Sequence, residues 1–316
     1  MSGAAQRDVW AATLVELARS NPDLLVLDGD LATSTRADRF AAAHPGRFLQ
    51  MGIAEQGMVG TAVGLASMGF VPWLSSFCVF FTHRAVDQVR MSVAQTHANV
   101  KIAGHYSGLQ TGFTGKTHLD VADLAVMRAM PGMTVLAPAD ATECAALVRW
   151  ATEHAGPVFL RLGREGTDDL FEPGSYRPAP GAPIRLREGR DLLLVSTGQQ
   201  TVRTLAAAEL LAGRGIEAGV LHLPFVKPLD AEALAAAAAD VPLVVTTEEH
   251  ATTGGLGGLV AEIVGERAPR RVVRLGIEDT WGESAPNAWL LERHGLTPER
   301  VAVRAAAEHD PRGATH

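Results

Sequence analysis

Apolar residues in the first half of the chain occur in short runs, separated by longer segments with helical spacing. The short runs lie at residues 24–27, 100–103, 134–136 and 158–161, and we interpret them as buried strands. The segments between them predict helices at roughly residues 7–20, 55–68, 82–97, 121–129 and 140–154. Strands that alternate with helices in this way are typical of βα units on a parallel sheet. The first half therefore predicts an α/β domain, which we bound at residues 1–165.

A second series of the same kind follows an irregular stretch. Residues 166–189 contain several prolines and glycines without periodicity, and we interpret them as a linker. Beyond it, strands are predicted at residues 192–195, 218–221, 243–246 and 272–275, with helices at 201–213 and 257–267. The fold class expected is therefore α/β with two parallel-sheet domains, the second at residues 190–316. A length of 316 residues agrees with two domains of ordinary size.

Composition narrows the classes of function. Apolar residues at 47% and charged residues at 20% are sufficient for packed cores. The formal net charge of −7 provides no basic excess for a phosphate backbone, so no nucleic-acid partner is expected. Cys78 and Cys144 are too few for a disulfide scaffold or a thiolate cluster, and no metal-ligating residues are predicted. Because no signal peptide and no apolar run of 18 residues is visible, we expect a cytoplasmic protein without membrane contact.

The most informative segment begins at Met51 and reads MGIAEQGMVGTAVGLA. Glu55 starts a predicted helix on which Gly57, Gly60 and Gly64 form a bare stripe. Each glycine costs about 1 kcal/mol relative to alanine within a helix, so packing or function must compensate. Spacing alone leaves a simpler alternative open, in which Glu55 only stabilises the helix N-terminus.

Six short segments, in this order, resemble the transketolase family of thiamine-diphosphate enzymes. The first is GIAEQ, which contains Glu55 and resembles the family's catalytic-glutamate segment. The others are SFCVFFTHRAVDQVR from residue 76, GKTH from 115, MRAMPGMTV from 127 with PAD from 138, KPLD from 227, and TEEH from 247 with GGLG from 254. The similarity extends over nearly the whole chain, as a pyrimidine-binding thiamine-diphosphate fold followed by a transketolase C-terminal-like domain.

The resemblance also implies a partner. The family's first domain binds Mg²⁺ and the diphosphate through a Gly-Asp-Gly segment, which has no counterpart here. The chain therefore resembles the C-terminal subunit of a split transketolase. The resemblance implies an N-terminal subunit that holds the diphosphate and most of the Mg²⁺ contacts. It further implies an α2β2 assembly around a homodimeric core of this chain.

Cofactor roles follow from the same resemblance. Glu55 is expected to hydrogen-bond a ring nitrogen of the aminopyrimidine of thiamine diphosphate, and so to promote loss of the thiazolium C2 proton. Three phenylalanines, Phe77, Phe80 and Phe81, are candidates for the aromatic that stacks on this ring, with Phe80 or Phe81 favoured. Asp30 and Leu31, after the first strand, are expected to contribute to the cofactor site as well.

Substrate roles are implied in the same way. His118 matches a histidine that assists proton transfer at the reacting carbons, and His105 matches one that contacts substrate. Arg7, Ser34 and Arg164, together with His105, match residues that bind a sugar phosphate. From the residues alone, Arg7 as a solvated helix residue and the histidines as structural residues remain alternatives.

One loop departs from the family pattern. The family usually has Gly-Glu-Asp-Gly-x-Thr-His-Gln, whereas residues 112–119 read GFTGKTHL. Thr114 replaces the acid that contacts the donor hydroxyl, Phe113 replaces a second acid, and Leu119 replaces the glutamine. We therefore expect an altered substrate, and Thr114 as a substrate-binding residue.

The function expected is transfer of a two-carbon ketol unit from a ketose or ketose phosphate to an aldehyde, through a thiamine-diphosphate carbanion. A carboligase subunit that resembles 1-deoxyxylulose-phosphate synthase and uses a 2-oxo acid is one alternative. The β subunit of a 2-oxo-acid dehydrogenase shares the glutamate segment, but its pattern does not match GKTH at 115 or MRAMP at 127. A regulatory paralogue without activity is the remaining alternative, which an intact Glu55 and His118 disfavour.

Overall fold

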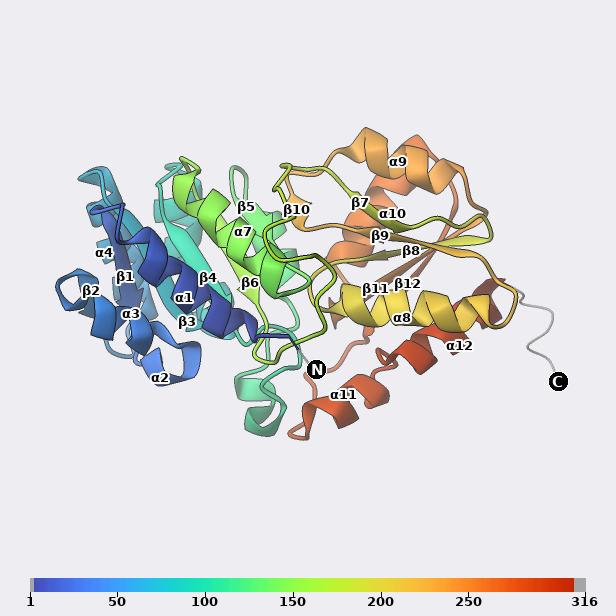
Figure 1. Ribbon diagram of the computed structural model, residues 1–316, viewed down its shortest axis with the longest axis horizontal. Helices are drawn as coiled ribbons and strands as arrows, with labels where there is room; N and C mark the ends of the chain where they lie inside the picture. Colours follow the sequence, from blue (N-terminus) through green and yellow to red (C-terminus); the bar gives the residue numbers. More distant parts are fainter. Residues whose placement is uncertain (1–2, 310–316) are drawn as a thin grey trace.

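The computed structural model describes residues 3–309 and contains two sheets that lie side by side (Figure 1). The first sheet has seven strands in the order β10-β5-β6-β4-β3-β1-β2, all parallel except β10. Its strands are β1 Leu24–Asp28, β2 Phe48–Gln50, β3 Val71–Phe77, β4 Lys101–His105, β5 Thr134–Leu136, β6 Val158–Leu162 and β10 Phe225–Lys227. Together with the second sheet, described below, this confirms the predicted α/β class with two sheets dominated by parallel strands.

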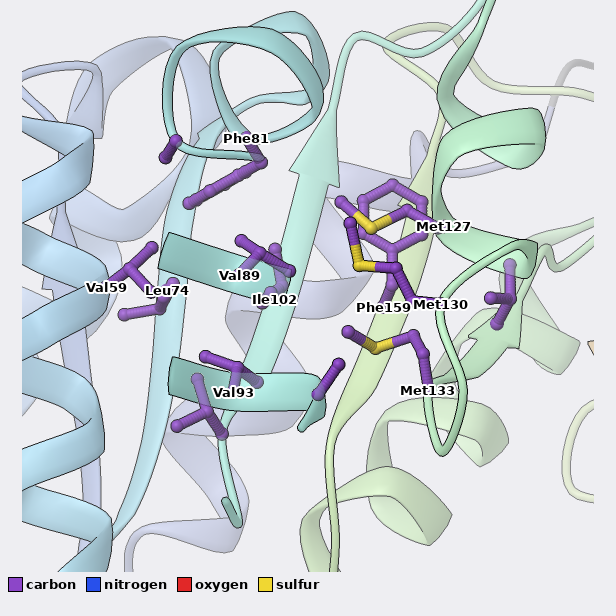
Figure 2. Packing of buried hydrophobic residues seen from close by; sticks show 14 of the residues in the cluster. Val59, Leu74, Phe81, Val89, Val93, Ile102, Met127, Met130, Met133 and Phe159 are labelled. Atoms are coloured by element: carbon purple, nitrogen blue, oxygen red, sulfur yellow. The ribbon is translucent and has the colours of Figure 1, made fainter. Parts of the chain in front are cut away.

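Helices cover both faces of the first sheet. One face packs against α1 Gln6–Leu17, α3 Ala37–Ala43 and α7 Ala141–Glu153, through a core around Trp10, Phe40 and Leu147. The other face packs against α4 Glu55–Ser67 and α6 Asp123–Arg128. Figure 2 shows this second core, in which Val59 lies near Leu74 and Met127 lies near Phe159. Burial on both faces explains why β1, β4, β5 and β6 read as continuous apolar runs.

The second sheet has the order β12-β11-β8-β9-β7, with β7 antiparallel to its neighbour. Its strands are β7 Ile184–Arg187, β8 Leu192–Ser196, β9 Ala218–His222, β11 Leu243–Ala251 and β12 Arg271–Ile277. The helices α8 Gln200–Ala212 and α12 Pro298–His309 cover one face, and α9 Ala231–Ala239 and α10 Leu256–Arg267 cover the other. The short helix α11 Asn287–Arg293 lies outside these layers, next to the first domain (Figure 1).

The two domains are joined more closely than a linker implies. Residues 184–187, inside the stretch interpreted as a linker, form β7 and pair with β9. The chain then crosses back after β9, because β10 pairs with β5 at the edge of the first sheet. Residues from the second half of the sequence thus complete the first sheet.

Several short elements were not predicted. These are β2, β3, β7, β10, the helices α2 Ala32–Thr35 and α3, and the carboxyl-terminal helices α11 and α12. The helix expected over residues 82–97 is irregular: two π-helical turns, Phe80–Arg84 and Val89–Ala94, flank the single turn α5 Val86–Gln88. No helix within residues 3–309 is long and apolar enough to span a membrane.

Candidate active site

The candidate site lies where the order of strands in the first sheet reverses. β1 connects to β2 on one side, whereas β3 lies on the other, and open α/β sheets bind ligands at such a point. Gly29 directly follows β1. A Cβ atom on Gly29 would lie 3.1 Å from Oγ of Ser76 and 3.5 Å from Oε1 of Glu55. Glycine therefore keeps the backbone close beside this carboxylate.

Glu55 is the first residue of α4 and is only 1% exposed. Ser76 donates a hydrogen bond from Oγ to Oε1 at 3.3 Å, and Arg84 donates from Nη1 to Oε2 at 2.6 Å. The helix N-terminus adds a field that favours negative charge. A buried carboxylate without such partners would be costly, and Ser76 and Arg84 provide them for Glu55.

Aromatic rings lie next to this carboxylate, connected to it through Arg84. The Arg84 guanidinium lies 4.3 Å above the ring of Phe80. Phe77 lies nearly parallel to Phe80, with ring centroids 6.0 Å apart, and stacks on Tyr106 at 4.2 Å. His118 meets both phenylalanines by its edge, at 6.0 and 5.5 Å. The structure thus brings Glu55, Phe77, Phe80 and His118 together from separate segments.

Phe81 does not belong to this group. Its side chain is fully buried in the core beneath α4, together with Val59 and Val89 (Figure 2). Phe80 and Phe81 are neighbours in the π-helical turn Phe80–Arg84, but only Phe80 lies under Arg84. The expectation that Phe81 could stack on the cofactor is therefore corrected: Phe81 is a core residue, and Phe77 and Phe80 remain as candidates.

A second group surrounds Tyr106 and contains three of the predicted anion-binding residues. Arg7 donates from Nη1 to the hydroxyl of Tyr106 at 2.5 Å and to the carbonyl oxygen of Ser34 at 2.9 Å. The guanidinium groups of Arg7 and Arg164 each lie 5.6 Å from the centroid of the Tyr106 ring. Two cations thus converge beside Ser34. Since Tyr106 also stacks on Phe77, this group adjoins the aromatic one.

His105, the last residue of β4, is fully buried with its ring edge-on to Trp10, at 4.7 Å between the ring centroids. Neither ring nitrogen has a hydrogen-bond partner among the residues described. Burial, and to a lesser extent the charge of Arg7, lowers the pKa of His105 to about 3, so the ring is neutral at physiological pH. The structure does not bring His105 to an accessible surface, and its contact with substrate stays a prediction.

Asp30 and Leu31 lie in the turn after β1. Asp30 is exposed and has a φ of 66°, and its backbone N–H donates to Oε1 of Gln50 at 3.1 Å. The N–H of Leu31 donates to the carboxylate of Asp28 at 2.8 Å. Burial raises the pKa of Asp28, although these bonds oppose the shift. Asp28 and Gln50 therefore hold the backbone of this turn in place.

The substituted loop forms a short helical segment, Gly112–Thr117, directly before His118. Thr114 is exposed and donates from Oγ1 to the carbonyl oxygen of Thr111 at 2.6 Å. Phe113 is 74% exposed, whereas Leu119 is buried among Leu109, Ile277 and Leu290. The loop therefore presents Thr114 and Phe113 outward, on the segment that leads to His118.

Sequence reasoning missed Ser76, Arg84 and Tyr106. Ser76 and Arg84 lie inside the segment that resembles the family, but spacing does not show that both point to Glu55. Tyr106 follows His105 directly and has a φ of 60°, which is uncommon for a residue other than glycine. This backbone conformation, visible only in the structure, turns its ring toward Phe77 and Arg7.

The residues present fit one half of thiamine diphosphate. A buried carboxylate next to flat aromatic faces suits a ring that carries nitrogen and is bound by stacking and one hydrogen bond. Within residues 3–309, no group of three or more His, Cys, Asp or Glu side chains is arranged to hold a metal ion. The buried Glu55 carboxylate and the rings of Phe77 and Phe80 match the pyrimidine end of the cofactor.

Comparison with known proteins agrees with a site for the pyrimidine end of the cofactor. Residues 2–168 match the family model of the transketolase pyrimidine binding domain, and residues 181–301 match that of the transketolase C-terminal domain. The chain is 39% identical over 302 residues to the 6-deoxy-6-sulfo-D-fructose transketolase subunit SqwH of Clostridium sp. (strain MSTE9), covering 96% of this chain and 93% of the relative.

Two further matches place the chain within a wider group. It is 37% identical to the 1-deoxy-D-xylulose-5-phosphate synthase of Symbiobacterium thermophilum, over 95% of this chain but only 46% of that enzyme. A solved structure described as a split gene transketolase, an inactive β4 tetramer, is 42% identical with a TM-score of 0.87, covering 96% of this chain and 97% of that one. By its two domains and by relatives that match it almost from end to end, the chain belongs to the transketolase family.

Proposed function

We propose that this chain is the C-terminal subunit of a split transketolase, which moves a two-carbon ketol unit from a ketose to an aldehyde. The observation that carries the proposal is the buried Glu55, paired with Arg84 beside Phe77, Phe80 and His118. This group lies in a chain whose residues 2–168 and 181–301 match the pyrimidine binding and C-terminal domains of the family.

Each residue of the group has a distinct task in this proposal. Thiamine diphosphate, when bound, supplies the nucleophilic carbon and accepts the electrons of the broken carbon–carbon bond. Glu55 holds a proton at a pyrimidine nitrogen, and Arg84 balances its charge. Phe80 provides the stacking face, Phe77 lies nearly parallel to Phe80, and Tyr106 in turn stacks on Phe77. His118 moves a proton at a hydroxyl of the sugar.

The substrate class follows from the group around Tyr106. Arg7 and Arg164 place two positive charges within reach of one anionic end of a sugar. A phosphate or a sulfonate fits this group, and the relative named for a sulfo-fructose substrate supports a ketose with such an end. We propose an anionic ketose as donor, with Thr114 beside its hydroxyl groups.

The proposal includes a partner subunit, which binds the diphosphate and Mg²⁺. It also includes a homodimeric core of this chain in an α2β2 assembly. A Cβ atom added to Gly57, Gly60 or Gly64 would meet nothing within 4 Å, so this stripe of α4 is open to a second chain. The relative described as a β4 tetramer supports association between copies of such a chain.

A second candidate function is a reaction like that of 1-deoxyxylulose-phosphate synthase. That reaction uses a 2-oxo acid as donor, and this chain has 37% identity with one such enzyme. The neutral Thr114 and the exposed Phe113, where the family is usually acidic, would suit a donor with fewer hydroxyl groups.

A donor panel separates the two functions. The chain assembled with its N-terminal subunit is supplied with ketose phosphates, a sulfo-ketose and pyruvate, and kcat/KM is measured for each. We expect turnover of an anionic ketose, and Thr114→Asp is expected to raise kcat/KM for common ketose phosphates about tenfold because a carboxylate accepts a stronger hydrogen bond. Val303→Ala, an exposed position on α12, serves as the control. Turnover of pyruvate alone would replace the first function with the second.

A further inference from the structure

We infer that Asn287 of the second domain positions the two segments of the first domain that contact the sugar, and thereby takes part in substrate choice. The inference rests on the proposed function. Asn287 begins α11, which lies beside the substituted loop (Figure 1). It is a positioning residue, since its contacts are to the protein segments that carry the substrate-binding side chains.

The first contact is to the loop that precedes His118. Oδ1 of Asn287 accepts the backbone N–H of Gly112 at 3.0 Å, and Nδ2 donates to the carbonyl oxygen of Gln110 at 3.1 Å. Ser284 adds a bond from Oγ to the carbonyl oxygen of Phe113 at 2.6 Å. The N–H of Ala285 donates to the carbonyl oxygen of Gly112 at 3.1 Å. The second domain thus holds the backbone of this loop at several points.

The joint between the loop and α11 is tight. A Cβ atom on Gly112 would come within 2.3 Å of the carbonyl oxygen of Ala285 and 2.7 Å of Oδ1 of Asn287. Contacts this short do not occur, so only glycine allows the loop to approach α11 so closely. Beneath it, Leu119 and Leu290 pack in one small apolar cluster.

The second contact is to the segment that carries Arg164. Nδ2 of Asn287 donates to Oε1 of Glu165 at 2.5 Å. The backbone N–H of Glu165 in turn donates to Oε1 of Gln110 at 2.9 Å, and its carbonyl oxygen accepts from Gln199 at 2.7 Å. Gln110 and Gln199 also bond to each other. One polar ring therefore joins the loop, the Arg164 segment and the second domain.

Asparagine suits this place because a single short side chain must accept one hydrogen bond and donate two. Alanine would leave Gly112 N–H and Gln110 C=O without their partner, and aspartate would set a second carboxylate against Glu165. Because an unmade hydrogen bond in a half-buried place is costly, the loop would open more often. Thr114 and Arg164 would then bind the sugar less well, while the elements that carry Glu55 and Phe80 would be unaffected.

The test uses the complex of this chain with its N-terminal subunit. In Asn287→Ala we expect KM for the donor sugar to rise about tenfold with kcat within twofold of the wild type, since the bonds lost act on binding. Hydrogen exchange of residues 109–118 should accelerate about tenfold, and the affinity for thiamine diphosphate should stay unchanged. Glu292→Ala, on the same helix but bonded to Arg300 and Thr297, is the matched control.

A compensating pair of substitutions distinguishes the loss of this contact from a general loss of folding. Asn287→Asp alone should raise KM further, because it sets two carboxylates against each other. Asn287→Asp combined with Glu165→Gln should recover part of the loss, because the introduced amide can donate a hydrogen bond to the introduced carboxylate, whereas the carbonyl oxygen of Gln110 stays without its donor. Unchanged KM and exchange in Asn287→Ala, or no recovery in the double variant, would overturn the inference. If the wild-type complex turns over no ketose, the proposed function fails, and hydrogen exchange still tests the role of Asn287.

Discussion

Glu55 illustrates how the site works at the scale of one residue. The carboxylate is buried, whereas its partner Arg84 is 42% exposed along its side chain, so the ion pair sits at the edge of the protein. Burial strengthens any hydrogen bond that Glu55 makes to a ligand, because less water competes there. Arg84 and Ser76 meanwhile prevent the cost of an isolated buried charge.

Glu55→Gln is expected to lower kcat of the assembled enzyme by about 100-fold or more, the range of a lost acid–base contribution. Glutamine keeps the size of the side chain, but its amide cannot share a proton with the pyrimidine nitrogen as a carboxylate can. The measurement is the rate of hydrogen–deuterium exchange at C2 of the bound cofactor. Glu266→Gln, an exposed position on α10, is the control, and an exchange rate equal to the wild type would remove Glu55 from the mechanism.

His105 makes a pH-dependent contribution to stability. Its pKa is about 3 in the folded protein and about 6.5 when exposed, so the unfolded chain binds more protons between these values. As pH falls from about 6.5 toward 4.5, stability is therefore lost by about 1.4 kcal/mol per pH unit from this group. Above about pH 6.5 the residue is neutral in both states and the effect is absent.

Replacement by an apolar residue isolates this effect. His105→Leu should flatten the pH dependence of urea unfolding between about pH 6.5 and 4.5 relative to the wild type. The other titratable groups, Asp28 with its raised pKa among them, are common to both proteins, so their contributions cancel in the difference. Parallel pH profiles for the two proteins would show that His105 is protonated in the folded state.

At the scale of elements, the predictable parts were those with strong periodicity. The buried runs of β1, β4, β5 and β6 and the segment of α4 were predicted within a few residues. β3 was not predicted because Pro72 and two serines interrupt its apolar pattern. Pro72 is compatible with the strand because it stands at the second position, near the start. β3 nevertheless carries Ser76 and Phe77, so a central part of the site was placed only by the structure.

The segment after β3 shows why side-chain direction could not be predicted. The predicted helix begins at residue 82, whereas the observed helical turn, Phe80–Arg84, is π-helical and includes both phenylalanines. In this turn Phe81 lies in the core and Phe80 lies under Arg84. Contacts such as that between Glu55 and Arg84, 29 positions apart, depend on such local geometry.

The prediction on assembly is that the glycine stripe of α4 lies at the interface between two copies of this chain. Gly60 lies on the open face, where an added Cβ atom would meet no atom of this chain, so Gly60→Leu should leave the fold of one chain intact. Against a second copy the leucine would clash, and we expect the dimer to weaken at least about tenfold. Light scattering across a concentration series checks this, with Gly265→Leu on the exposed side of α10 as control. If Gly60→Leu still forms a native dimer with full activity, the glycine stripe does not lie at the interface between copies.

At the scale of the whole molecule, the two domains act as one unit. β10 from the second half of the chain completes the first sheet. The carboxylate of Glu249, which pairs with Arg203 in the second domain, also accepts the N–H of Leu109 from the first. Glu55 with Phe77 and Phe80, and Arg7 with Arg164, are the groups that the proposed function assigns to the pyrimidine and to the sugar. In that proposal the chain provides half of an active site, and its partner subunit provides the other half.

Calorimetric titration of thiamine diphosphate with Mg²⁺, into this chain alone and into its complex with the N-terminal subunit, shows whether one chain or both are needed to bind the cofactor. The chain alone should show no binding in the micromolar range, because one carboxylate and a stacking face cannot replace the contacts to a diphosphate. The complex should bind in that range, and only with Mg²⁺ present. Mg²⁺-dependent micromolar binding by the chain alone would contradict a site shared between two subunits.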